Sequence, residues 1–179
     1  MAKTMSLRTV HITRAAVLLA LLVAWQYASA PLGITLITGS GVNLILACCA
    51  VTCGFAPGLL MALISPFLAR MLGIGPTWVF VPFIAAGNLV FALIWRLLSG
   101  GKRYTAVRSV IAAIAAAIVK FAVIYIGIVQ IAIPLILKPS EKAAETLSAA
   151  FSVPQLISAL IAGGLAIAVL PIITSKTRV

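Results

Sequence analysis

Apolar stretches long enough to cross a lipid bilayer follow one another along almost the whole chain. A membrane-spanning helix needs roughly 20 residues to cross a hydrocarbon core about 30 Å thick. Six apolar stretches, of which the third is short, are separated by turn-forming segments, with approximate ranges 12–30, 39–55, 59–72, 78–98, 106–137 and 151–173. Because 64% of the 179 residues are hydrophobic and 8% are charged, a water-soluble globule would expose large apolar patches. The sequence predicts an all-α integral membrane bundle of six helices, forming one transmembrane domain over residues 1–179.

Two of these stretches differ from a simple membrane helix. The first resembles a secretory signal, with a basic start, an apolar centre and Ala28-Ser29-Ala30 where cleavage would occur. Pro31 directly follows that site and disfavours cleavage, so we expect a retained helix. The fifth stretch is longer than one crossing requires, so we expect it to tilt or to break near Pro134.

Basic residues indicate which side of the membrane each end faces, because lysine and arginine are retained in cytoplasmic loops. They form three groups: Lys3, Arg8 and Arg14; Arg96, Lys102, Arg103 and Arg108; Lys176 and Arg178. With six spans all three groups fall on one side, which predicts that both termini are cytoplasmic. The net charge of +11 then reflects topology rather than binding to nucleic acid.

Two basic residues break this pattern and are candidate ligand contacts. Lys120 lies near the middle of the fifth stretch, where a charged side chain costs about 2.5–3.5 kcal/mol on insertion scales. Arg70 lies at the outer end of the third, and the chain's two acids, Glu141 and Glu145, are outside all the stretches. Structural explanations are snorkelling to headgroups for Arg70, and for Lys120 a deep snorkel or a hydrogen-bonded structural lysine. The functional interpretation is that one or both meet a carboxylate or phosphate of a ligand.

Neutral polar side chains in the outer half of the bundle are candidates to complete such a pocket. The strongest are Asn43, Asn88, Gln155, Trp78 and Tyr27, and weaker ones are Gln26, Thr35, Thr38, Ser40 and Gln130. Trp78 is more often an interfacial anchor than a ligand contact, and the segment around Ser40 is also explained as a cap of the second helix.

Signals of catalysis are missing from the sequence. His11 is the single histidine, and no phosphate-binding glycine loop followed by lysine is present. Cys48, Cys49 and Cys53 fall in one apolar run and are interpreted as small core residues rather than metal ligands or a disulfide pair. We therefore expect a protein that is not an enzyme and uses no cofactor or metal. Any uphill transport would take its energy from another subunit.

Small residues on the first helix suggest a docking face. Ala16, Ala20 and Ala24 are spaced four residues apart, which places them on one face and lets another helix approach closely. The alternative is internal packing, because alanine stripes also occur in the fifth and sixth stretches.

Taken together, these features resemble the substrate-binding S components of energy-coupling factor (ECF) transporters over essentially the whole chain. The resemblance is carried by the size, the six spans, Ala16-x-x-x-Ala20 and the segments 38–43, 65–67, 73–76, 87–89 and 151–156. It implies a multi-pass protein of the bacterial plasma membrane that captures a vitamin or related micronutrient from outside. It also implies that Ala16 and Ala20 dock onto a membrane coupling subunit, which binds two ABC-type ATPases, and that Arg70, Asn88, Lys120 and Gln155 contact the ligand.

The substrate and two competing functions stay open. Cations without acids favour an anionic vitamin such as pantothenate, nicotinate or biotin over cationic thiamine. A non-transport membrane scaffold of a cell-shape or lipid pathway would have similar topology but need no pocket. A self-sufficient secondary carrier is disfavoured by the missing intramembrane acids and internal repeat.

Overall fold

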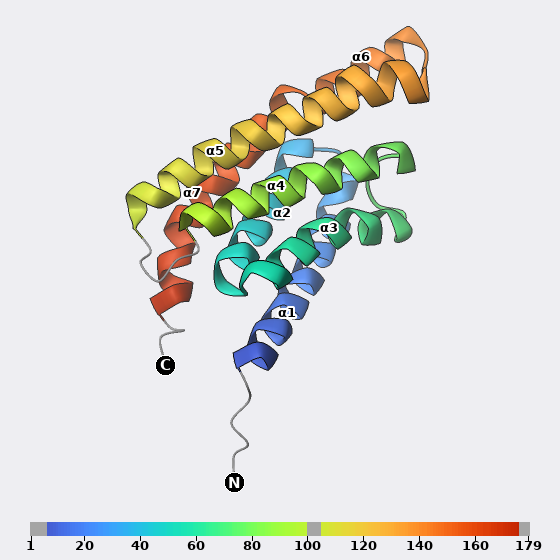
Figure 1. The fold of residues 1–179 in the computed structure, drawn as a ribbon. Helices are drawn as coiled ribbons and strands as arrows, with labels where there is room; N and C mark the ends of the chain where they lie inside the picture. The colour runs from blue at the N-terminus through green and yellow to red at the C-terminus, as the bar shows by residue number, and fades with distance from the viewer. Residues whose placement is uncertain (1–6, 100–104, 176–179) are drawn as a thin grey trace.

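The structure, a computed structural model, describes residues 7–99 and 105–175, and these residues form helices joined by short connections (Figure 1). The α-helices are α1 (Leu7–Ser29), α2 (Thr35–Thr52), α3 (Phe55–Met71), α4 (Val81–Ser99), α5 (Ala106–Ile124), α6 (Glu141–Ala150) and α7 (Val153–Ser175). Two 3₁₀ turns, η1 (Ala30–Leu32) and η2 (Trp78–Phe80), precede α2 and α4, and a π-helix, η3 (Tyr125–Leu137), continues α5.

Five helical segments of the described residues are long and apolar enough to cross a membrane, and α3 is a shorter apolar helix. This confirms the all-α prediction, and the length and apolarity of the helices indicate a multi-pass membrane protein. Some boundaries differ from the expected ranges. Helix α2 begins at Thr35 rather than near residue 39, and residues 141–150, expected as a loop, form α6.

Glycines allow the tight reversals between the first three helices. Gly33 follows η1 with φ 65°, and Gly54 separates α2 from α3 with φ 97°. Residues that carry a side chain rarely adopt a positive φ, so glycine is the residue that permits both turns. Helix α2 therefore runs antiparallel to α1 and α3 with little connecting chain.

The helix formed by α5 and η3 is the longest in the bundle and does not break at Pro134 (Figure 1). Proline removes one backbone donor, yet the π-helix continues to Leu137 and closes with Lys138 N–H donating to the Ile133 carbonyl at 2.9 Å. Gly127 allows η3 to lie close to α4, because a Cβ there would lie 2.4 Å from Cδ1 of Phe83. Of the two alternatives for this stretch, a break near Pro134 is not observed, and a tilt stays a prediction.

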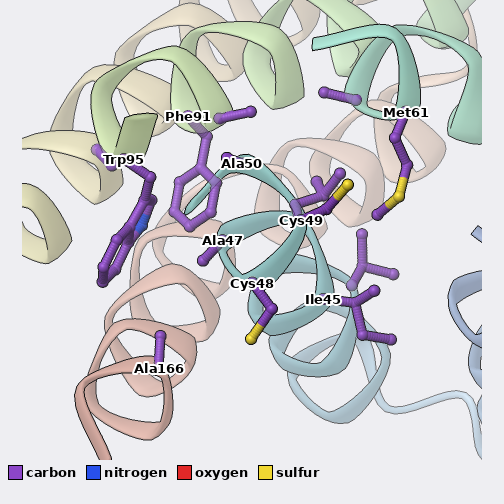
Figure 2. Packing of buried hydrophobic residues seen from close by; sticks show 14 of the residues in the cluster. Ile45, Ala47, Cys48, Cys49, Ala50, Met61, Phe91, Trp95 and Ala166 are labelled. Atoms are coloured by element: carbon purple, nitrogen blue, oxygen red, sulfur yellow. The ribbon is translucent and has the colours of Figure 1, made fainter. Parts of the chain in front are cut away.

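The main core surrounds α2, which contacts α1, α3, α4 and α7. Figure 2 shows Cys48 and Cys49 of this helix among buried side chains that include Phe91 and Trp95 of α4. Cys53 is also buried and all three thiols are free, in agreement with their interpretation as core residues. Small residues bring α5 and α7 together, and the buried alanines of α5 are Ala112, Ala113, Ala116 and Ala117.

A second, smaller core lies where η2, η3 and α6 meet. Phe80, Ile124, Ile128, Ala132 and Ile133 are buried there, with Phe151 packed against them. The rings of Phe80 and Phe151 meet edge to face with centroids 5.2 Å apart. This cluster holds α6 against the end of the bundle.

The helix ends fall into two groups (Figure 1). The start of α1, the end of α4, the start of α5 and the end of α7 lie toward one end of the bundle, which we call the basic end because Arg14, Arg96 and Arg108 belong to these segments. Helix α6 lies at the opposite end, which we call the α6 end. The Nη1 atom of Arg96 donates to the Val51 carbonyl at 3.4 Å, so the end of α2 also belongs to the basic end.

Candidate binding site

The side chain of Lys120 points into the bundle and joins three helices. Its Nζ donates to Oδ1 of Asn43 on α2 at 2.5 Å and to Oδ1 of Asn88 on α4 at 2.6 Å. All three side chains are buried, with exposed fractions of 4% for Lys120, 1% for Asn43 and 2% for Asn88. Asn43 and Asn88 are the chain's only asparagines, so both amides of this type meet the one intramembrane lysine.

Residues of α4 accommodate and contact the amine of Lys120. A Cβ on Gly87 would lie 2.8 Å from Cγ1 of Ile124 and 3.6 Å from Cγ of Lys120, so glycine allows α5 to approach α4 beside Asn88. One turn further along α4, the ring centroid of Phe91 lies 5.4 Å from Nζ, which adds a cation–π contact. Helix α4 thus supplies a gap, an acceptor and an aromatic face.

The positive charge of Lys120 has amide partners but no carboxylate. The chain's two acids, Glu141 and Glu145, are exposed residues of α6. An ammonium carries three N–H donors, and the two amide oxygens accept two of them. The third donor and the net charge remain for another group.

Lys120, Asn43 and Asn88 line a cavity of about 320 Å³. Its lining runs from these buried residues to the exposed Gly33 and Thr35 at the start of α2, so the cavity reaches from the core to the surface of the bundle. Apolar side chains, including Val42, Ile84 and Phe151, form much of the wall. The site therefore combines an apolar enclosure with a few polar groups, as small-molecule sites do.

Two buried polar atoms of the lining residues have no hydrogen-bond partner within the part of the chain that the structure describes. They are Nδ2 of Asn43 and Oε1 of Gln26. A buried polar atom without a partner costs about 1–3 kcal/mol. Both atoms belong to residues at the wall of the cavity, one as a donor and one as an acceptor.

The structure brings together four of the seven strongest site candidates. Asn43, Asn88, Lys120 and Gln155 line the cavity, as do the weaker candidates Gln26, Thr35 and Thr38. Nε2 of Gln155 donates to the Ala150 carbonyl at 3.4 Å, which ties the start of α7 to the end of α6.

The other three strong candidates lie outside this lining. The guanidinium carbon of Arg70 is 6.0 Å from the ring centroid of Trp78, so these two side chains contact each other rather than the cavity. Tyr27 is exposed and lies beside the first-helix alanines. Of the weaker candidates, Ser40 lines a separate apolar pocket and Gln130 is exposed on η3.

Sequence reasoning did not place Phe91 or Phe151 at the site. Phe91 lies three residues after Asn88, and this helical spacing puts both on one face of α4. The spacing could therefore have identified Phe91 as a neighbour of the site. No sequence pattern identifies Phe151 in this way, because its position depends on how α6 packs against η2.

The alanines of α1 are exposed, unlike those of α5. Ala16, Ala20 and Ala24 line a shallow groove of about 700 Å³ whose other wall is formed by Leu68, Met71 and Leu72 at the end of α3. The stripe does not serve packing within this chain. It leaves an apolar surface with small side chains at its centre.

No family model, curated protein or solved structure matches this chain. The chemistry of the cavity itself therefore carries the functional argument. Among the described lining residues it offers one cation, amide donors and acceptors, and an apolar wall.

Proposed function

We propose that this protein is the membrane substrate-binding subunit of an ECF-type transporter, located in a bacterial plasma membrane. It captures a vitamin or related micronutrient of anionic character from the outside. The observation that carries the proposal is the buried Lys120, which has amide partners but no acid and lines a cavity that reaches the surface. A bound anion supplies the missing charge in a bundle where an uncompensated cation is costly.

The direction of capture follows from the charges at the helix ends. Arg14, Arg96 and Arg108 belong to the basic end, and the positive-inside rule assigns that end to the cytoplasm. The exposed part of the cavity lining, at Gly33 and Thr35, is at the other end of α2. With α3 as a sixth, short crossing, both termini are cytoplasmic and the cavity opens outward.

The exposed alanine groove of α1 and α3 supports a partner in the membrane. Ala16, Ala20 and Ala24 let a helix of a coupling subunit lie close to α1, since small side chains permit close backbone approach. That coupling subunit binds two ABC-type ATPases, which hydrolyse ATP for the uptake. The present chain contributes recognition of the substrate.

The test is a thermal-shift screen of the purified protein against pantothenate, nicotinate, biotin and thiamine. A ligand present at 100 times its Kd stabilises the folded state by about 2.7 kcal/mol. We expect an anionic vitamin to raise the Tm of the wild type and of the control Lys142→Met, whose lysine is exposed on α6. The same vitamin should not raise the Tm of Lys120→Met. An equal rise in Lys120→Met would refute the role of this amine.

Partner docking is tested separately by co-purification with an ECF coupling subunit. Ala20→Trp fills the groove on α1 and should abolish the complex while ligand stabilisation is kept. Leu160→Trp, on an exposed position of α7, is the matched control and should leave the complex intact. Equal recovery of both variants in the complex would contradict docking at this groove.

A further inference from the structure

The orientation of the Asn43 amide is fixed by Lys120. A lysine ammonium only donates hydrogen bonds, so the amide oxygen must face Nζ, as observed at 2.5 Å. The amide nitrogen Nδ2 is therefore turned away from the amine. It is buried, without a partner among the described residues, and belongs to a residue that lines the cavity.

Two hydrogen-bond donors consequently lie one amide group apart. Counting partners within residues 7–99 and 105–175, Lys120 has one N–H left after its bonds to Asn43 and Asn88, and Nδ2 of Asn43 has both of its hydrogens free. A planar group with two acceptor oxygens on one carbon can take one bond from each. A carboxylate has this form and gains further from the charge of the amine.

The charge of the cavity limits the ligand to one negative charge. Lys120 is the single basic residue among the lining residues that the structure describes, and Arg70 contacts Trp78 outside the lining. A carboxylate neutralises Lys120. A phosphate monoester carries a charge of about −1.5 to −2 near pH 7, so it would leave an excess negative charge inside an apolar bundle.

The size of the cavity adds a second limit. At about 320 Å³ it lies near the lower end of ligand pockets, which span about 300–1,000 Å³. It suits a single small ring or a short chain. A nucleotide-linked or tetrapyrrole-sized compound would be too large.

Resting on the proposed function, we infer that the substrate is a small monocarboxylic acid whose carboxylate bridges Nζ of Lys120 and Nδ2 of Asn43. Neutral amides and phosphate esters of similar shape are rejected, the first because they leave the amine without a counterion and the second because they bring too much charge.

Three probes that share one ring test this selectivity without knowledge of the natural substrate: benzoate, benzamide and phenyl phosphate, each titrated at millimolar concentration in thermal-shift measurements. Benzoate should raise the Tm of the wild type and of the control Lys142→Met, and benzamide and phenyl phosphate should give at least about tenfold weaker apparent binding, the factor expected from losing one charge-assisted hydrogen bond. Benzoate stabilisation should be lost in Lys120→Met. Equal shifts with all three probes, a larger shift with phenyl phosphate or benzamide, or no shift with benzoate would overturn the inference.

A second variant provides the carboxylate within the chain. Asn43→Asp places a negative oxygen beside Nζ, so the protein without ligand should melt at a higher temperature than the wild type and no longer respond to benzoate. A folded Asn43→Asp protein that still responds to benzoate as the wild type does would contradict the bridge.

These outcomes separate the inference from the proposed function. A neutral or phosphorylated vitamin that binds in a Lys120-dependent manner would end the inference and leave the substrate-binding function standing. Benzoate selectivity in a protein that binds none of the vitamins and recruits no coupling subunit would leave the inference standing and contradict the transport function.

Discussion

Replacing Asn88 by leucine tests how much this amide stabilises the buried charge of Lys120. The substitution removes the acceptor at 2.6 Å and keeps a side chain of similar size. A hydrogen bond to a charged group contributes about 1.5–3 kcal/mol in proteins, and measured pairs in membrane bundles average about 0.6 and reach about 1.7 kcal/mol. The ranges overlap near 1.5 kcal/mol, which is the loss of unfolding free energy that we expect for Asn88→Leu.

Replacing the lysine itself should be milder. Lys120→Met leaves the oxygens of Asn43 and Asn88 without their donor, at about 1–3 kcal/mol each. It also removes a cation whose placement in the membrane costs about 2.5–3.5 kcal/mol. Taken at their midpoints, a loss of about 4 kcal/mol and a gain of about 3 kcal/mol leave an expected net loss of about 1 kcal/mol. The double variant Asn88→Leu/Lys120→Met should recover most of the loss caused by Asn88→Leu alone, because no buried cation is then left with a single amide.

The assay is reversible unfolding in mixed micelles, followed by circular dichroism as the denaturing detergent is increased. Gln130→Leu, which replaces an exposed amide on η3, is the control and should change the unfolding free energy by less than about 0.5 kcal/mol. If Asn88→Leu is as stable as this control, or if the double variant is less stable than both single variants, the amides do not stabilise the charge and the reasoning fails.

Two further predictions concern close helix contacts. Gly163→Ala should lower the unfolding free energy by about 1–3 kcal/mol, because its Cβ would lie 2.6 Å from the Cβ of Ala113. The control Gly164→Ala, whose Cβ meets nothing within 4 Å, should leave the unfolding free energy unchanged or raise it by up to about 1 kcal/mol in the same detergent titration. Equal effects of the two substitutions would contradict the packing of α5 on α7. Gly127→Ala should destabilise by a similar amount through the contact with Phe83, and the combination with Phe83→Ala should destabilise less than the sum of the two single changes; strict additivity of the melting shifts would show that η3 does not approach α4 as closely as observed.

The class of the protein and the isolation of Lys120 were predictable because both follow from local composition. Apolar length decides whether a segment can cross a bilayer, and a lysine within such a segment is recognisable from the sequence whichever way its helix is rotated. The sequence also identified Asn43, Asn88 and Gln155 as polar positions in the same half of the bundle. The fifth stretch ends at Leu137, as expected, but the rule that proline breaks a helix does not anticipate the π-helical form in which η3 continues past Pro134.

Which side chains meet was decided by the tertiary structure. Asn43 lies 77 residues and Asn88 lies 32 residues from Lys120 along the chain, and only the packing of α2, α4 and α5 brings them to one amine. The same packing places Arg70 against Trp78 and turns the alanines of α1 outward while those of α5 are buried. Helices that are apolar on all sides carry no strong pattern to show which face turns inward. That rotation is set by close contacts with neighbouring helices, such as the one that Gly87 permits, and it determines which polar groups share a cavity.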